Sequence, residues 1–270
     1  MSAAVRVAIG SLGSVGMALA RRLAQGQQGL TLAAVSARDV TRATQRLASL
    51  GLQVPVLALE ELTGAADVVV ECAPAEHFRT LAEPVVRAGK VLVPISVAGL
   101  LDHMDLVDLA RHSGARILVP SGAILGLDAL RAASEGEITQ VRMITRKPPR
   151  GLRGAPYLVR NGISVENLDA PLKVFEGTAA QGARGFPANV NVAAAVGLAG
   201  VGPERTMLEI WADPGVDRNV HDIQVTADSA SFTMHIENVP SQENPRTGRL
   251  VALSVLATLR RLCEPLVIGT

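Results

Sequence analysis

The sequence predicts an α/β protein: a doubly wound parallel sheet followed by a second domain of the α+β class. Up to residue 120, short and almost uninterrupted apolar segments alternate with segments of helical periodicity, a pattern typical of a parallel sheet covered by helices on both faces. Beyond residue 120, several segments alternate between apolar and polar residues, as strands do in a largely antiparallel sheet with one solvated face. A chain of 270 residues is long enough for two domains.

The first predicted strand, residues 5–9, leads into a turn in which glycine recurs every third residue. Good helix formers follow the turn, so backbone N–H groups and the positive end of a helix dipole would face a phosphate. This order is typical of a Rossmann-type dinucleotide-binding domain, although an ordinary tight turn has the same spacing. Ser11 stands where the usual fingerprint has its first glycine. The predicted phosphate-binding residues are Gly10, Ser11, Leu12, Gly13, Ser14, Val15 and Gly16.

The second predicted strand covers residues 30–35. In domains of this type, the residues that follow this strand determine whether NAD or NADP is bound. An acidic residue there would hold the ribose 2′-hydroxyl of NAD, whereas small or basic residues accommodate a 2′-phosphate. This chain has Ser36 and Arg38, and Asp39 is placed to cap the next helix. NADP, or use of both cofactors, is therefore favoured over strict use of NAD. The alternative is that Arg38 is a solvated arginine at a helix start.

Strands are predicted over residues 66–71, 90–97 and 115–120, with helices over 75–88 and 100–112 between them. Ligands of such sheets bind at the carboxyl ends of the strands. Cys72 and Ala73 follow one of these ends and are predicted to line the cofactor site, in one crevice with the glycine turn.

The second domain is predicted from residue 121 to 245, with a buried helix over 188–198. Its strands are expected at residues 138–145, 172–176, 204–212, 219–227 and 231–237. The segment 246–270 contains an amphipathic helix that we expect to pack on the first domain, residues 1–120. The open sheet of the second domain suggests a homodimer, because an exposed edge or face needs covering.

The composition excludes several classes of partner. Apolar residues make up 48% and charged residues 19%, as in ordinary globular proteins. Aromatic residues make up only 2% and the formal net charge is +1, which argues against a nucleic-acid or membrane partner. Cys72 and Cys263 stand far apart without histidine clusters, so neither a disulfide framework nor a metal site is indicated. With no signal peptide or membrane-length apolar run, we expect a cytoplasmic protein.

His221 is the candidate catalytic residue among the five histidines. It closes a turn-rich loop, residues 212–221, in which acidic residues lie beside an arginine. Nearby carboxylates would favour the charged imidazolium and orient the ring. The alternative is a structural loop histidine.

Four segments, in this order along the chain, resemble the L-aspartate dehydrogenase family. They are 120–130 (PSGAILGLDAL), 145–149 (TRKPP), 185–195 (GFPANVNVAAA) and 212–221, which opens with ADP and closes with RNVH. The resemblance covers essentially the whole chain. It implies that NAD or NADP oxidises L-aspartate to iminoaspartate, which yields oxaloacetate and ammonia or enters NAD biosynthesis. It also implies that His221 is the active-site residue and that Ala123 and Asn189 contact the cofactor.

A substrate with two carboxylates needs local cations. The candidates are Arg146, Lys147, Arg150 and Arg218, each of which could instead be a solvated surface residue. Asn189 or Asn191 could hold the carboxamide of the nicotinamide or cap the helix. The predicted substrate-binding residues are Arg146, Lys147, Asn191 and Arg218.

The chain departs from the family pattern at Ser11 and at Leu125, which stands where the family usually has glycine. Two alternatives to an aspartate dehydrogenase therefore stay open. One is a related dehydrogenase or reductase of another amino or oxo dicarboxylate. The other is a cofactor-binding sensor without turnover.

Overall fold

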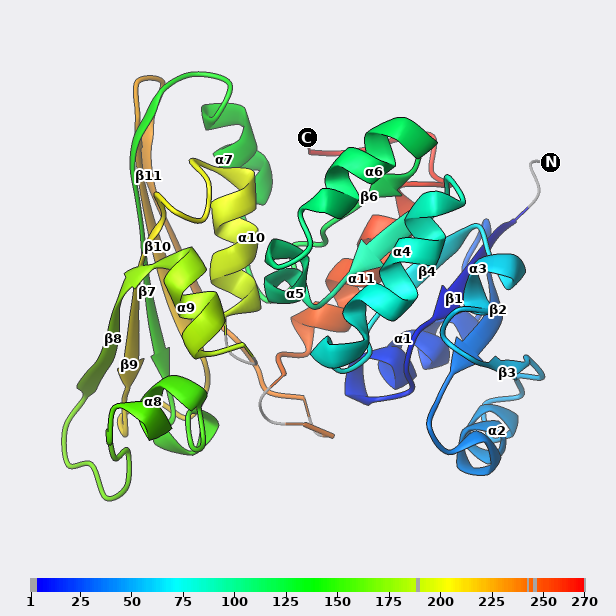
Figure 1. Ribbon diagram of the computed structural model, residues 1–270, viewed down its shortest axis with the longest axis horizontal. Coiled ribbons are helices and arrows are strands. Elements are labelled where there is room, and N and C mark those ends of the chain that lie inside the picture. The colour runs from blue at the N-terminus through cyan, green and yellow to red at the C-terminus, as the bar shows by residue number, and fades with distance from the viewer. Residues whose placement is uncertain (1–3, 188–189, 242, 245–246, 270) are drawn as a thin grey trace. The chain divides into compact units, whose positions relative to one another are not determined.

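The computed structural model describes residues 4–187, 190–241, 243–244 and 247–269 (Figure 1). The chain divides into two compact units. The first comprises Met1–Pro120 and Val251–Ile268, and the second comprises Ser121–Leu250 and Gly269–Thr270.

The first unit is built on a six-stranded sheet in the order β3-β2-β1-β4-β5-β6, with all neighbouring strands parallel. This confirms the predicted doubly wound sheet. The strands are β1 (Val5–Ile9), β2 (Leu30–Ser36), β3 (Val56–Leu57), β4 (Val68–Glu71), β5 (Val91–Pro94) and β6 (Arg116–Ile117). The helices are α1 (Ser14–Ala24), α2 (Val40–Ala48), α3 (Leu62–Ala65), the 3₁₀ turn η1 (Ala75–His77), α4 (Phe78–Arg87), α5 (Val97–Leu101), α6 (Asp105–Ser113) and α11 (Leu250–Arg260).

Several predicted boundaries in this unit differ from the observed ones. The strand predicted to reach residue 97 ends at Pro94, and the helix predicted over 100–112 is divided into α5 and α6. The strand predicted over 115–120 is reduced to Arg116–Ile117 at the sheet edge. At the start of α2, Asp39 does cap the helix, because its carboxylate accepts a hydrogen bond from the backbone N–H of Arg42 at 2.9 Å.

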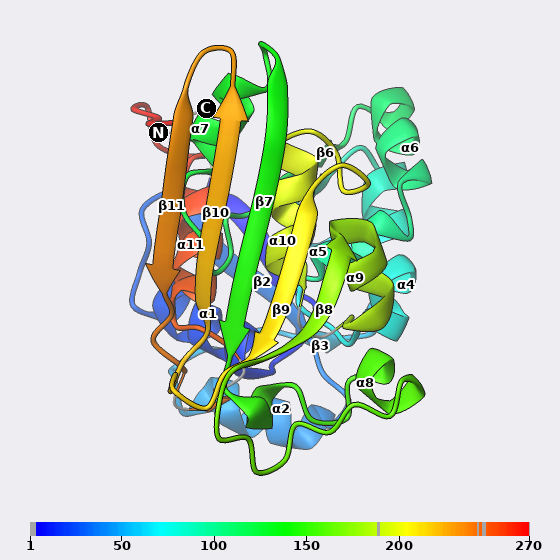
Figure 2. The same ribbon diagram turned by 90° about the vertical axis from the view of Figure 1, so that its left-hand side faces the viewer.

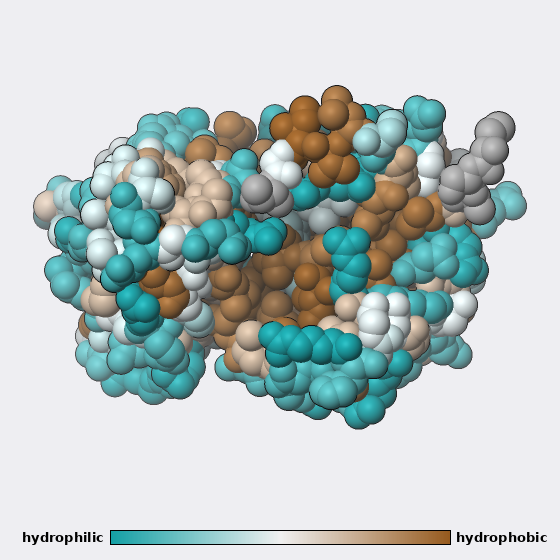
Figure 3. Space-filling view, turned by 90° about the horizontal axis from the view of Figure 1, so that it is seen from above, coloured by the Kyte–Doolittle hydropathy of each residue, from teal (hydrophilic) through white to brown (hydrophobic). Residues whose placement is uncertain are grey.

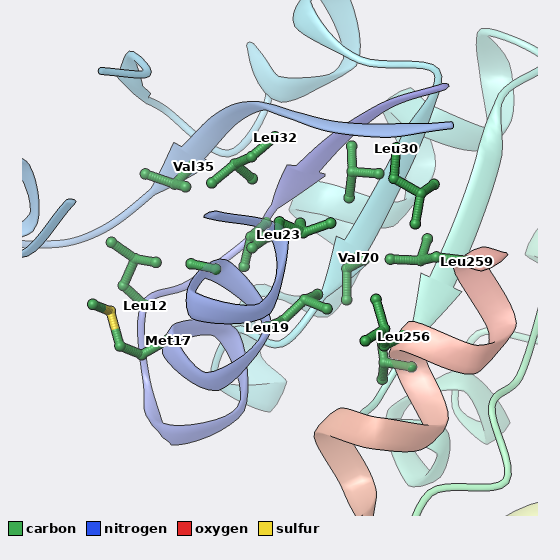
Figure 4. Close-up of a cluster of buried hydrophobic side chains, with 14 of the residues drawn as sticks. Leu12, Met17, Leu19, Leu23, Leu30, Leu32, Val35, Val70, Leu256 and Leu259 are labelled. Carbon is green, nitrogen blue, oxygen red and sulfur yellow. The ribbon is translucent and has the colours of Figure 1, made fainter. Parts of the chain in front are cut away.

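The core of the first unit lies between its sheet and the helices α1 and α11. Leu19 and Leu23 of α1, with Leu256 and Leu259 of α11, point toward the apolar strand residues (Figure 4). Fully burying a leucine contributes about 1.5–3 kcal/mol, so this cluster is enough to fasten the C-terminal helix to the first unit.

The second unit is built on a five-stranded sheet in the order β11-β10-β7-β9-β8 (Figure 2). Strands β7 and β9 are parallel and the other neighbours are antiparallel. The strands are β7 (Ile138–Lys147), β8 (Leu172–Thr178), β9 (Met207–Ala212), β10 (Val220–Ala227) and β11 (Ser231–Glu237). The helical segments are α7 (Leu127–Ala133), the 3₁₀ turn η2 (Pro149–Gly151), α8 (Pro156–Arg160), α9 (Ala179–Gly185) and α10 (Asn191–Ala199).

The helices α7, α9 and α10 pack on one face of this sheet, which we call the inner face (Figure 1). Along β7 the burial alternates, because successive side chains of a strand point to opposite faces. Met143, Thr145 and Lys147 are buried on the inner face, whereas Arg142 and Arg146 lie on the opposite, outer face. Residues of the two faces thus alternate along one strand.

Candidate active site

The glycine turn of the first unit joins β1 to the start of α1. Gly13 is the N-cap residue of α1, no side chain caps the helix start, and the first turn contains no acidic residue. The first backbone N–H groups of α1 are therefore left to an external acceptor, and the helix dipole favours an anion there. The geometry fits the pyrophosphate of a dinucleotide.

The three glycines of this turn are needed for different reasons. A Cβ on Gly10 would lie 2.3 Å from Cδ1 of Leu81, and one on Gly16 would lie 1.8 Å from the carbonyl oxygen of Ser11. The fold itself therefore requires glycine at both positions. A Cβ on Gly13 would have, among the described residues, only Oγ of Ser11 within 4 Å, at 3.8 Å. At position 13, the absent side chain leaves space for a ligand instead.

Arg46 of α2 is a cation near this turn that sequence reasoning missed. Its guanidinium donates a hydrogen bond of 3.1 Å to the carbonyl oxygen of Leu12. At the end of β2, Ser36 is buried and Arg38 is exposed. For Arg38 the described part of the chain supplies no hydrogen bond or ion pair, so its guanidinium is available to a phosphate.

A buried carboxylate, also missed by sequence reasoning, holds the carboxyl ends of β4 and β5 together. Glu71 is fully buried and accepts hydrogen bonds from the backbone N–H of Ile95 and of Ser96, at 3.2 and 2.9 Å, and from the Ser96 hydroxyl at 3.1 Å. Burial raises its pKa although these hydrogen bonds act in the opposite direction. The one available signal was an acidic residue ending an otherwise apolar strand.

Cys72 and Ala73, the predicted cofactor-lining residues, follow Glu71 directly. The Cys72 thiol donates to the carbonyl oxygen of Ser11 at 3.2 Å, which ties the end of β4 to the glycine turn. Burial raises the pKa of this thiol to about 12, so Cys72 stays a neutral thiol and supports the turn.

The second unit brings His221 and Lys147 together on the inner face. His221 of β10 pairs with Thr145 of β7 in the antiparallel register, and Lys147 lies two residues further along β7 on the same face. The three side chains are 2%, 3% and 5% exposed for His221, Thr145 and Lys147, respectively. Oγ1 of Thr145 lies 3.1 Å from Nδ1 of His221.

This environment keeps the imidazole neutral. Burial, helped by the positive charge of Lys147, lowers the pKa of His221 to about 3. Burial also lowers the pKa of Lys147 to about 8. The expectation that the acids of the loop would favour the charged imidazolium is therefore wrong. The reason is that Asp213 pairs with Arg146 and Asp217 with Arg218, while the ring contacts the hydroxyl of Thr145 instead of a carboxylate.

The other candidate cations contact groups other than the His221 ring. The guanidinium of Arg146 lies on the outer face, 3.1 Å from the Asp213 carboxylate and 5.0 Å above the ring of Trp211. Arg218 forms an ion pair of 2.7 Å with the neighbouring Asp217, and Arg150 donates to the carbonyl oxygen of Asp217 at 3.3 Å. The alternation of β7 thus separates Arg146 from Lys147, although the two are neighbours in sequence.

Of the other residues predicted in the second unit, those that the structure describes lie at a helix start or in a loop. Asn191 is the first residue of α10, whereas Asn189 lies outside the described residues. The carbonyl oxygen of Ala123 accepts a hydrogen bond of 2.9 Å from the amide of Asn238, a buried residue that sequence reasoning missed. Leu125 is 44% exposed, and Gly126 beside it has a φ of 73°.

The comparisons with known proteins cover the whole chain. Residues 128–262 match the family model described as "Aspartate dehydrogenase, C-terminal", and residues 12–120 match the NAD binding domain of homoserine dehydrogenase. The L-aspartate dehydrogenase of Bradyrhizobium diazoefficiens is 55% identical over 269 residues, which cover 100% of this chain and 95% of that protein. The chain belongs to the L-aspartate dehydrogenase family. The family prediction is confirmed.

Two further relatives support this family membership. L-aspartate dehydrogenase 3 of Bordetella bronchiseptica is 51% identical, with 98% of this chain and 97% of that protein covered. The crystal structure of aspartate dehydrogenase from Thermotoga maritima superimposes with a TM-score of 0.74 at 25% identity, covering 99% of this chain and 100% of that one. These proteins share with this chain both of its units.

Neither a metal-binding cluster nor a membrane-spanning helix is found among the described residues. They contain no group of three or more His, Cys, Asp or Glu residues arranged to hold a metal ion. None of the helices formed by these residues is long and apolar enough to cross a membrane.

The first prediction separates the glycines of the turn. Gly13→Ala leaves the stability of the fold almost unchanged but weakens dinucleotide binding by about tenfold or more, because the added methyl group enters the space open to the ligand. Gly16→Ala, the matched control, lowers the melting temperature because its methyl group meets the Ser11 carbonyl. Calorimetric cofactor titration and thermal unfolding measure the two effects. Unchanged cofactor affinity in Gly13→Ala would refute this role.

The second prediction concerns stability against pH. The folded-state pKa of His221, about 3, lies below the unfolded value of about 6.5, so the unfolded state binds the extra proton between these values. His221 therefore makes the free energy of unfolding fall by about 1.4 kcal/mol per pH unit as the pH drops below about 6. Urea unfolding of the wild type and of His221→Gln between pH 7 and 5 measures this. Equal slopes for both proteins would show that His221 is not buried as a neutral ring.

Proposed function

We propose that the protein is an NAD(P)-dependent L-aspartate dehydrogenase, which oxidises L-aspartate to iminoaspartate; hydrolysis then gives oxaloacetate and ammonia. The observation that carries this proposal is the placement of His221 and Lys147 on the same buried face of the sheet, in a chain that aligns over its full length with L-aspartate dehydrogenases. A basic nitrogen beside a cation suits a substrate that has an amine to deprotonate and carboxylates to hold.

The first unit has what a dinucleotide needs. The helix start without a side-chain cap and the open space at Gly13 would receive the pyrophosphate. When bound, the nicotinamide supplies the chemistry that the protein lacks, since it accepts the hydride that leaves Cα of aspartate. Ser36 and Arg38 at the end of β2 support use of NADP as well as NAD, because a small and a basic residue there can accommodate a 2′-phosphate.

Lys147 would hold one carboxylate of the substrate. Its ammonium group is the cation that lies on the same buried face as His221, whereas Arg146 lies on the outer face beside Asp213. A charge-assisted hydrogen bond to a buried ammonium is among the stronger polar interactions. Carboxylate binding would also offset the positive field of Lys147 at the imidazole and thus raise the pKa of His221.

His221 would act as the general base. As a neutral imidazole it has a lone pair available to take a proton from the α-ammonium of aspartate before the hydride leaves, or from the water that attacks the imine. The low pKa of His221 in the free protein makes the ring a weak base. A bound dicarboxylate would raise this pKa and so make the ring a stronger base. Binding of the substrate would therefore increase the basicity of His221.

We also propose a homodimer and a cytoplasmic location. The outer face of the five-stranded sheet, seen face-on in Figure 2, carries Trp211 between the cations Arg146 and Lys173. Burying this face against a second copy would cover the open side of the sheet. Sedimentation equilibrium tests the dimer against the chain mass of 28.1 kDa. A supply of iminoaspartate for NAD biosynthesis is part of the same proposal.

The third prediction tests the activity. With L-aspartate and either NAD⁺ or NADP⁺ the wild type produces the absorbance of the reduced nicotinamide, and a panel of other amino acids gives rates at least tenfold lower. His221→Ala lowers kcat with aspartate by about 10²–10⁴-fold, the usual worth of a general acid or base. Lys147→Met raises the KM for aspartate and leaves the affinity for the cofactor unchanged.

Three results would overturn parts of this proposal. Faster oxidation of another amino dicarboxylate would identify a related dehydrogenase, and cofactor binding without oxidation of any panel member would identify a sensor. An unchanged kcat in His221→Ala would remove His221 from the reaction even if aspartate is the substrate.

A further inference from the structure

The neutral ring of His221 can exist as either of two tautomers. A hydroxyl group beside Nδ1 can stabilise one of them. A neutral imidazole carries a proton on one nitrogen and a lone pair on the other. Only a ring with its proton on Nδ1 has a basic Nε2. In the intrinsically preferred tautomer the proton is instead on Nε2, and the ring would then offer the substrate a donor. A base at this position therefore needs an acceptor at Nδ1.

Thr145 is placed to be that acceptor. Its Oγ1 lies 3.1 Å from Nδ1 of His221, and the two residues are register partners across β7 and β10. Both side chains are at least nine-tenths buried, at 3% and 2% exposure, so bulk water does not compete for this hydrogen bond. Within the described part of the chain, the hydrogen-bond partner of the ring is Thr145.

We propose that Thr145 is a positioning residue whose hydroxyl accepts the Nδ1–H of His221 and thereby directs the lone pair on Nε2 to the substrate. This inference rests on the proposed function for the identity of the substrate, but the tautomer it assigns belongs to the free protein. Thr145 touches neither substrate nor cofactor in this role. It acts through His221.

A threonine suits this position better than the carboxylate that orients histidine in many hydrolases. A carboxylate beside Nδ1 would stabilise the imidazolium and so keep the base protonated. It would also lie on the same buried face as Lys147 and pair with its ammonium group, in competition with the carboxylate of the substrate. A hydroxyl group orients the ring without adding charge. Because threonine is β-branched, its χ1 angle is also restricted in a strand, which keeps Oγ1 in place.

The fourth prediction uses a matched pair of variants at this position. Thr145→Val keeps the shape of the side chain and its preference for a strand but removes the hydroxyl, whereas Thr145→Ser keeps the hydroxyl. We expect Thr145→Val to lower kcat with aspartate by about 10- to 100-fold with little change in the KM for the cofactor, and Thr145→Ser to stay within about threefold of the wild type.

The tautomer is measured directly, without any activity. Nitrogen-15 NMR of histidine-labelled protein at pH 7 distinguishes a protonated Nδ1 from a protonated Nε2. The expected result is a protonated Nδ1 for His221 in the wild type and in Thr145→Ser, and a shift of the proton to Nε2 in Thr145→Val. The His221→Gln variant identifies the signal of this ring among the five histidines.

Each outcome decides the proposal. A wild-type ring protonated on Nε2, or on both nitrogens, would overturn it, and so would a Thr145→Val variant with wild-type kcat. If the wild type does not oxidise aspartate, the proposed function fails while the NMR result still decides the role of Thr145. If Thr145→Val does not fold, which the fluorescence of the chain's one tryptophan would report, the wild-type and Thr145→Ser spectra decide it.

Discussion

A neutral imidazole buried beside an ammonium group is the interaction on which the proposed chemistry of the second unit depends. Neither His221 nor Lys147 gains from burial by itself, since burial lowers the pKa of both. In the proposed reaction, a carboxylate of the substrate would supply negative charge close to both groups. In the proposed reaction, a buried face that carries an ammonium group beside a neutral imidazole would be a physical basis for selecting an anionic substrate.

In the first unit, backbone groups would supply most of the contacts to the cofactor. The start of α1 offers N–H groups, and the glycines around it are either required by close packing or open toward a ligand. Glu71 and Cys72 then hold the neighbouring strand ends in place through hydrogen bonds to backbone groups of Ser96 and Ser11. Titratable side chains serve here as supports for a turn. In the second unit, His221 and Lys147 would serve the proposed reaction itself.

Because the chain has few aromatic residues, most of its core is built from aliphatic side chains. Leucine, valine and alanine fill the core of the first unit, and the three phenylalanine and tyrosine rings at positions 157, 175 and 186 pack together in the second. Hydrophilic side chains dominate much of the surface seen in Figure 3, with apolar side chains gathered in local patches. Exposed apolar residues near the C-terminus include Leu266 and Ile268.

The sequence by itself determined the fold class, the glycine turn and the family, because these depend on local order: a strand followed by glycines and a helix, and apolar periodicities that differ between the two halves. It also offered His221 as the candidate catalytic residue and Lys147 as one of four candidate cations. What surrounds them was decided by tertiary structure alone. The register of β7 and β10 sets Thr145 against His221, and strand alternation places Lys147 inside and Arg146 outside. The acids near His221 in sequence pair with arginines instead, so the charge of the ring could not be predicted from its neighbours along the chain. A pKa depends on burial and on groups brought close in space, and neither is written in the order of the residues.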